Sequence, residues 1–221
     1  GAVAGGLLGG LAGALSGGDQ AGRNALIGAT AGALVGGAAA YYNERQKQVA
    51  DDKQRIASYA GDFERSSEDL DRSIAYAKAA QDCYQGEFGK LRAARRARSM
   101  SDAEGRSRFA EIVSGLRETN ALLAAVDGRA GEDIDTYTQA YEKDLQQVGV
   151  ERQRVTAAAS KPAAKPKAVP QEAVTTEQKL QQATTKRSEA QAVSSRGSSM
   201  LSSACSNPDI GDWGGDACSS V

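Results

Sequence analysis

Residues 55–91 read RIASYAGDFERSSEDLDRSIAYAKAAQDCYQGEFGKL, and this stretch decides the fold. Apolar residues recur in it at intervals of seven, and the same row extends back toward the N-terminus. The row comprises Tyr42, Val49, Ile56, Phe63, Leu70, Ala77, Tyr84 and Leu91. A repeat of seven held over so many turns is typical of helices packed along a supercoiled seam. We therefore predict one long helix from Asn43 to Arg98.

The face of this helix opposite the apolar row carries charges of both signs, which predicts a solvated surface. These residues are Glu44, Arg45, Lys47, Asp51, Asp52, Lys53 and Arg55. Glycines at 61, 86 and 89 lower the helix propensity locally and predict bends.

The predicted helix ends in a basic cluster formed by Lys90, Arg92, Arg95, Arg96 and Arg98. One interpretation is that these residues complement the negative end of the helix dipole. The other is that Arg92, Arg95, Arg96 and Arg98 form a basic contact for an anionic polymer, a nucleic acid or the acidic surface of a partner. Ser101 and Glu104 then form a capping-box pattern, which predicts the start of the next helix.

A second long helix is predicted over residues 102–158. Phe109, Leu116, Leu123, Ala130 and Tyr137 form its row of seven-residue intervals. A short connection between two helices of similar length predicts an antiparallel pair. Gly128 and Gly131 interrupt the pattern, and we expect a break there.

Prolines at 162, 166 and 170 predict an extended linker over 160–170. Residues 171–193 predict a further helix, marginal on its own, that packs on the long pair or on neighbouring copies. Its apolar residues are Val174, Leu180, Ala183, Ala190 and Val193. A serine-rich stretch, 194–203, is expected to follow that helix.

Three cysteines are present, at 83, 205 and 218. Cys205 and Cys218 bracket a short loop rich in Gly, Asp, Asn and Pro, which predicts a disulfide and hence an oxidising compartment. Two free thiols on a flexible tail are the alternative. Cys83 lies in a helical stretch and is expected to be buried rather than bonded. Trp213, inside the loop, is assigned either to partner contact or to an end cap.

The N-terminal 42 residues contain two apolar segments with glycine at every fourth position, joined by a polar turn. The ladder comprises Gly1, Gly5, Gly9, Gly13, Gly17, Gly28, Gly32 and Gly36. Glycine rows of this kind let membrane helices approach closely, and helix satisfies the backbone in lipid. We predict a membrane hairpin, with Tyr41 and Tyr42 in an interfacial aromatic belt. The chain begins with glycine rather than methionine, and we expect that a leader was removed.

GAVAGGLLGGLAGALSGG and NALIGATAGALVGGAAAYYNERQKQ resemble the bacterial glycine-zipper family, in which two GxxxG-repeat membrane segments form a helical hairpin. The resemblance covers about a fifth of the chain and implies contact with membrane lipid and self-association. Segments of Gly and Ala are weak stop-transfer signals. We therefore favour the outer membrane over the inner; a soluble glycine-rich interaction segment is the alternative.

The composition argues against several kinds of chemistry. Without histidine, neither a Ser-His-Asp nor a Cys-His arrangement can be built, and the ligands of a typical zinc site are missing. No phosphate-binding loop motif is present, so we predict no enzyme and no cofactor. Calcium held by Asp209, Asp212 and Asp216 matches no EF-hand spacing. A net charge of −1 makes nucleic-acid binding unlikely as a general property.

We thus expect an all-α protein with a membrane hairpin at 1–42, a long helical hairpin at 43–159, a linker at 160–170, and a helix with a disulfide-closed tail at 171–221. The predicted function is a structural or assembly protein of a bacterial cell envelope. It would form homo-oligomers, within a larger envelope complex or alone, and project its helices into the periplasm. The alternative is a pore-forming or conduit subunit, an α-helical tube for secretion or DNA delivery.

Overall fold

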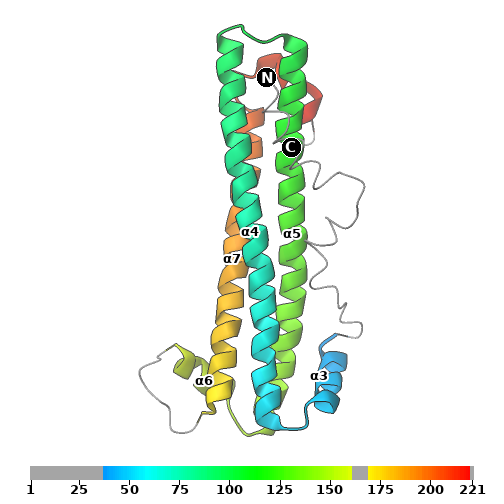
Figure 1. Cartoon of the computed structure of the whole chain (residues 1–221), viewed down its shortest axis with the longest axis vertical. Coiled ribbons are helices and arrows are strands. Elements are labelled where there is room, and N and C mark those ends of the chain that lie inside the picture. The colour runs from blue at the N-terminus through cyan, green and yellow to red at the C-terminus, as the bar shows by residue number, and fades with distance from the viewer. Residues whose placement is uncertain (1–36, 161–168, 220–221) are drawn as a thin grey trace. The chain divides into compact units, whose positions relative to one another are not determined.

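A computed structural model describes residues 37–160 and 169–219 of the chain. The fold is all-α, with helices that pack antiparallel (Figure 1). The helices are α3 (Gly37–Gln48), α4 (Asp52–Arg96), α5 (Asp102–Gln147), α6 (Arg152–Ala159) and α7 (Gln171–Cys205), followed by the 3₁₀ turns η2 (Gly211–Trp213) and η3 (Gly215–Cys218). The predicted glycine-ladder hairpin and most of the linker lie outside the described residues.

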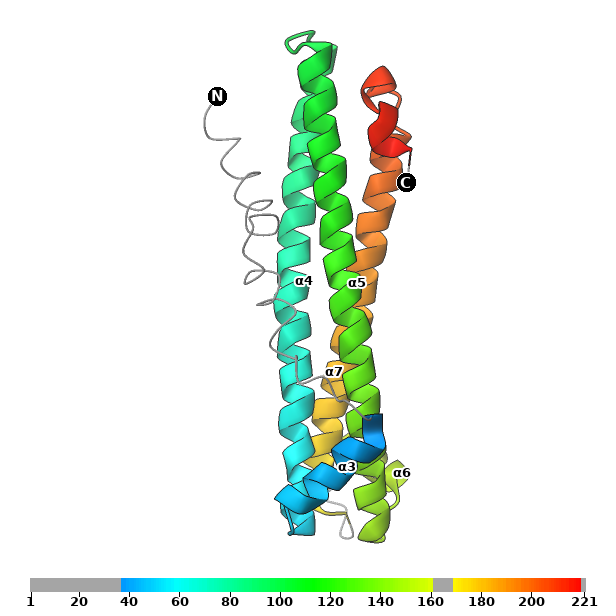
Figure 2. The same cartoon turned by 90° about the vertical axis from the view of Figure 1, so that its right-hand side faces the viewer.

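The chain divides into two compact units, and α4, α5 and α7 each contribute a segment to both. We call the described residues 37–71, 126–160 and 169–189 the tyrosine unit, because tyrosines line its core. Residues 72–125 and 190–219 form the cysteine unit, which contains the three cysteines. In each unit, segments of α4, α5 and α7 run side by side (Figures 1 and 2).

The predicted apolar rows form the cores of both units. From Ile56 to Leu91 every member of the first row is buried. In the second row Phe109, Leu116, Leu123 and Ala130 are buried, whereas Tyr137 is half-buried. All five apolar residues that we assigned to the third helix are buried as well. The prediction of an antiparallel helical pair with a third helix against it is confirmed.

The first predicted helix is broken at a point where we expected it to continue. It starts at Gly37 instead of Asn43, stops at Gln48 and resumes as α4 at Asp52. Asp51 caps α4, because its Oδ1 accepts a hydrogen bond from the backbone N–H of Gln54 at 2.8 Å. The predicted bends at 61, 86 and 89 do not end α4, which is continuous through all three glycines.

The second predicted helix breaks at Gly149 rather than at Gly128 or Gly131. Gly149 has φ +70°, and Val150 N–H bonds to Leu145 O at 2.9 Å while Gly149 N–H bonds to Gln146 O at 3.1 Å. This pair of bonds is a Schellman motif, which satisfies the last carbonyls of α5. The predicted helix start at Ser101 is confirmed, since Glu104 N–H bonds to Ser101 Oγ at 3.3 Å and Ser101 thereby caps α5.

Helix α7 continues through the serine-rich stretch, which we had expected to follow a shorter helix. The hydroxyls of Ser198 and Ser199 bond to the carbonyls of Ser194 and Ser195, at 3.2 and 3.0 Å. Serine disfavours helix by competing for backbone groups, but bonding four residues back satisfies the hydroxyl inside the helix. Leu201 and Ala204 are buried in the cysteine unit and hold this last part of α7 in place.

Two glycines of α5 are expected to respond in opposite directions to substitution by alanine. A Cβ at Gly115 would lie 2.1 Å from Oη and 2.2 Å from Cζ of the buried Tyr84, whereas a Cβ at Gly128 meets nothing within 4 Å. We predict that Gly115→Ala lowers the free energy of unfolding by about 1–3 kcal/mol, and that Gly128→Ala raises it by up to about 1 kcal/mol. Urea titration followed by circular dichroism measures both; equal effects would contradict the packing of Tyr84 on α5.

Candidate functional site

Several carboxylates are buried in the tyrosine unit, and two of them bind α3. The first of these two is Asp144 of α5. Its side chain is fully buried, at 0% exposure. It accepts hydrogen bonds from Arg55 Nε at 2.9 Å, from the Tyr59 hydroxyl at 2.8 Å and from Gln46 Nε2 at 2.7 Å. Because these donors come from α3 and α4, one carboxylate joins three helices. A buried charge requires such pairing, since its desolvation would otherwise destabilise the fold.

Arg55 corrects our expectation of a solvated charged face. Its side chain is only 2% exposed, and Nη1 also donates to the carbonyl of Val49 at 3.0 Å, at the break before α4. Burial lowers the pKa of Arg55, but the bonds to Asp144 and Asp52 outweigh this effect, so its net pKa is raised. Arg55 stays charged and holds the start of α4 against α5.

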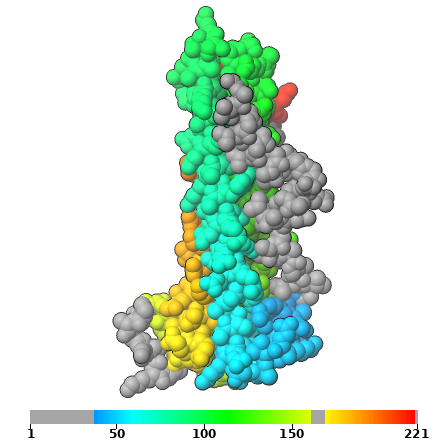
Figure 3. Space-filling model, in the orientation of Figure 1, coloured from blue at the N-terminus to red at the C-terminus, as the bar shows by residue number. Residues whose placement is uncertain are grey.

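The second buried carboxylate, Asp62 of α4, binds the helix that follows the glycine ladder. It accepts hydrogen bonds from the Tyr41 hydroxyl and the Arg45 guanidinium, both on α3, and from Arg65. Figure 3 shows α3 side chains packed directly beside those of α4. Arg45 was also placed on the solvated face, and this assignment is wrong because Asp62 draws it into the unit.

Tyr41, which we predicted in an interfacial belt, lies among other aromatic rings of the tyrosine unit. Its ring centroid is 4.9 Å from that of Tyr137 and 6.0 Å from that of Tyr59. Burial, assisted by Asp62, raises the pKa of Tyr41 above its ordinary range, and burial raises the pKa of Tyr137 to about 12. Both hydroxyls remain protonated near neutral pH, and that of Tyr41 donates to Asp62. These contacts fix α3 to the tyrosine unit. We call the residues that make them the α3 joint, which comprises Tyr41, Arg45, Gln46, Arg55, Tyr59, Asp62 and Asp144.

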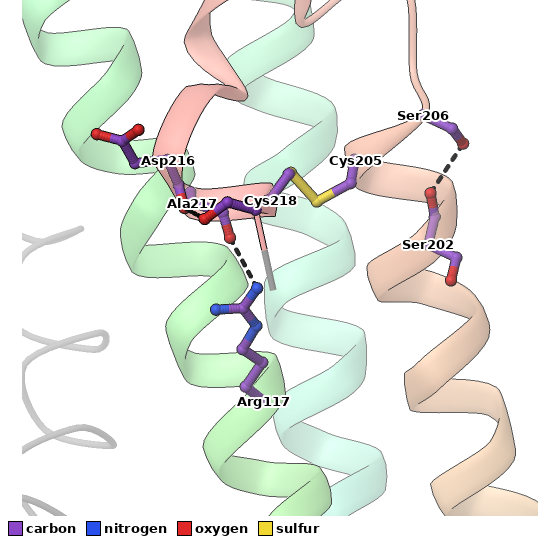
Figure 4. Close-up of a disulfide and its surroundings, with 8 residues drawn as sticks. Arg117, Ser202, Cys205, Ser206, Asp216, Ala217 and Cys218 are labelled. Carbon is purple, nitrogen blue, oxygen red and sulfur yellow. Dashed lines mark hydrogen bonds between the residues drawn. A yellow bond between two sulfur atoms is a disulfide. The ribbon is translucent and has the colours of Figure 1, made fainter. Parts of the chain in front are cut away.

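In the cysteine unit, Cys205 and Cys218 form the predicted disulfide. It joins the last residue of α7 to η3, with the two Cα atoms 5.6 Å apart. Figure 4 shows Arg117 of α5 reaching the same loop, where its Nη2 donates to the carbonyl of Ala217 at 2.9 Å. Residues 206–219, which we call the C-terminal loop, are therefore tied to both α7 and α5. Cys83 is half-buried and carries a free thiol.

Trp213 forms an end cap, one of the two roles that we considered for it. Its side chain is 2% exposed, so it is not on the surface for a partner. Nε1 donates to Asp102 Oδ1 at 2.8 Å, and the Arg95 guanidinium lies 4.6 Å from the ring centroid. A Cβ at Gly105 would lie 2.4 Å from the indole. The glycine therefore provides the space in which the indole covers the start of α5.

The predicted basic contact faces the chain's own acidic loop. Arg92 and Arg96 both bond to Asp209, and Arg95 bonds to Asp212 at 2.7 Å. Hydrogen bonds from these arginines hold the pKa values of Asp209 and Asp212 below their usual range. Arg98 is exposed and sits in the turn after α4 with φ +51°.

Of the three aspartates considered for calcium, Asp209 and Asp212 are engaged in ion pairs. In the part of the chain that the structure describes, no three Asp, Glu, Cys or His side chains gather in a group that could hold a metal ion. The ladder glycines, from Gly1 to Gly36, lie outside the described residues. Of the joint residues, sequence reasoning missed Asp62 and Asp144, whose partners lie up to 98 residues away.

Comparisons with protein-family models, with curated proteins and with solved structures each find no match to this chain. Within residues 37–160 and 169–219, no helix has both the length and the apolar character that a membrane span requires. The family resemblance of the glycine ladder accordingly stays a prediction.

Removing Asp144 is expected to destabilise the protein strongly, because Arg55 would keep its charge without its buried partner. We predict that Asp144→Ala lowers the free energy of unfolding by about 3–5 kcal/mol. The exposed Asp135 on the same helix provides the matched control, and Asp135→Ala should change stability by less than about 0.5 kcal/mol. Replacing the pair together, as Arg55→Met/Asp144→Leu, should recover most of the loss. Urea titrations of the four proteins test this; equal losses for the two aspartates would refute the α3 joint.

Reducing the disulfide is expected to release the C-terminal loop, and Trp213, the only tryptophan of the chain, reports on it. With a sequence separation of 13 between the two cysteines, the cross-link should contribute about 3 kcal/mol. We predict a red shift of the tryptophan emission with dithiothreitol in a Cys83→Ser background. Gly105→Ala, which displaces the indole, should shift the emission with the disulfide intact. An unchanged emission on reduction would mean that the arginine pairs alone hold the loop.

Proposed function

We propose that this chain is a non-catalytic structural or assembly protein of a bacterial cell envelope. In this proposal the glycine ladder forms a membrane hairpin, and the helices that follow project from it into the periplasm. The observation that carries the proposal is the α3 joint. Helix α3 begins directly after the ladder and is held to the tyrosine unit through Asp62 and Asp144. Such a joint would couple an anchor to a helical body.

The disulfide supports a compartment outside the cytoplasm. Disulfides persist in the periplasm and at the cell surface and are rare in the reducing cytosol. Cys205 and Cys218 belong to a loop that is also secured by Arg117 and by the Asp209 and Asp212 pairs. Because a hairpin leaves both its ends on one side of the membrane, α3 and everything after it would lie on the oxidising side.

Self-association through the ladder is the second part of the proposal. The described helices bury their apolar rows within the chain, so these rows are already occupied. The ladder offers small residues on two faces, the arrangement that lets further membrane helices approach closely. We therefore propose contact with membrane lipid and a homo-oligomer, in the outer membrane in preference to the inner, with a larger envelope complex as its setting.

A conduit subunit, the alternative from the sequence, requires a second apolar flank on the long helices. The row from Ile56 to Leu91 packs against α5 and α7 in the same chain, which favours the assembly protein. Ion conductance of the reconstituted oligomer in planar bilayers would instead favour the conduit.

The proposal is tested by substitutions that remove the ladder without touching the described helices. We predict that the full chain, extracted from membranes in mild detergent, has an oligomeric mass by multi-angle light scattering, and that Gly9→Ile/Gly32→Ile reduces it to that of a monomer. The physical reason is that branched side chains keep the helix backbones apart. Leu11→Ile/Leu34→Ile introduces the same β-branched residue at positions off the ladder and should leave the mass unchanged.

Two results would contradict the proposal. One is a wild-type chain that fractionates as a monomer without membranes. The other is equal assembly of both double variants.

Thiol labelling without reductant tests the compartment. Only Cys83 should react in protein taken from cells. Labelling of all three cysteines would place the chain in a reducing compartment.

A further inference from the structure

The cysteine unit contains a cavity of about 540 Å³ between α4, α5 and α7. This volume is within the range of about 300–1,000 Å³ that is typical of small-molecule sites. Its floor is apolar and comes from all three helices, with Tyr84 and Phe88 on α4, Ile112 and Leu116 on α5, and Met200 on α7. Phe88 and Met200 are half-buried and line the entrance, whereas the other three are buried.

Small residues leave this space open. Gly89 of α4 faces Ser199, Ser203 and Ala204 of α7 around the cavity, and a Cβ at Gly89 would meet nothing within 4 Å. Packed helices normally interdigitate to crystal-like density, with few voids larger than a water molecule. The small residues on α4 and α7 therefore account for the open space at this position.

The rim of the cavity carries arginines. Arg92 and Arg196 line it, and none of the lining residues that the structure describes is acidic. Arg196 pairs with Asp82 outside the lining, at 2.8 Å. Arg92 lies over the Phe88 ring, with its Cζ 5.8 Å from the ring centroid. Arg92 and Arg96 share a single carboxylate oxygen, Asp209 Oδ2. Two guanidinium groups against one carboxylate leave an excess of positive charge at this end of the cavity.

We propose that this cavity binds a free long-chain fatty acid, with its acyl chain on the apolar floor and its carboxylate at Arg92. The apolar floor matches a single hydrocarbon tail, and a guanidinium group binds a carboxylate through charge-assisted hydrogen bonds. The site lies wholly within the cysteine unit and does not depend on the proposed membrane function.

The test uses the full chain in zwitterionic lipid nanodiscs and a dansyl-labelled undecanoic acid as the probe. Gly89→Leu fills the open space, and leucine improves the helix propensity of the position, so this variant should fold. Gly86→Leu is the matched control, because Gly86 is one turn away, equally open and not part of the lining. We expect Gly89→Leu to weaken probe binding at least about tenfold, a loss of 1.4 kcal/mol, and Gly86→Leu to leave it unchanged. Background binding to lipid or to the ladder is the same in both.

A second pair of variants tests the head-group contact. Arg92→Gln and Arg96→Gln both remove a bond to Asp209, but only Arg92 lines the cavity. We expect Arg92→Gln to weaken probe binding about tenfold and Arg96→Gln to have little effect. Unlabelled palmitate should displace the probe, whereas lysophosphatidylcholine should not. Equal binding by the two leucine variants, equal losses in the two glutamine variants, or displacement by the lysolipid alone would each overturn the proposal.

Discussion

The arrangement of the tyrosine unit depends on one buried carboxylate. Asp144 has no access to water, so its charge is tolerated only because Arg55, Tyr59 and Gln46 donate to it. Each donor has to come from a defined place on its helix, which fixes the register of α4 and α3 against α5. Apolar side chains tolerate small slides along a seam, whereas a buried ion pair does not. We infer that Asp144 contributes more to the choice of register than to net stability.

The cysteine unit fixes its helices by other means. There the end of α7 is secured covalently by Cys205 and Cys218, and the loop that follows inserts Trp213 beside Gly105. Its ion pairs, such as Arg92 with Asp209, are partly exposed, and pairs of this kind contribute little individually. The covalent bond and the indole therefore determine how this unit closes, and the arginines orient the loop.

Sequence periodicity predicted the helical rows because burial of an apolar stripe depends on spacing along one helix, which a single sequence contains. Every row member from Ile56 to Leu91 is buried for this reason. The α3 joint could not be predicted, since Arg55 and Asp144 are 89 residues apart and each resembles an ordinary surface charge. The continuation of α7 was missed because the Ser198 and Ser199 hydroxyls bond inside the helix. The basic cluster was recognised, but its acidic partner is the chain's own loop.

The polar character of the joint has a mechanical consequence for α3. None of its residues is fully buried, and a helix of 12 residues is marginal on its own in water. Its position is therefore set less by buried area than by the donors that it supplies to Asp62 and Asp144. If α3 moved away, Asp62 would lose Tyr41 and Arg45, and Asp144 would lose Gln46. Of their donors in the described part of the chain, Asp62 would keep only Arg65, and Asp144 would keep only Arg55 and Tyr59. Losing a donor to a buried acceptor is costly, so the docked position of α3 is favoured by the groups beneath it. We infer that a displacement at Gly37, where α3 begins, would pass to α4 and α5, whereas a flexible linker would absorb it.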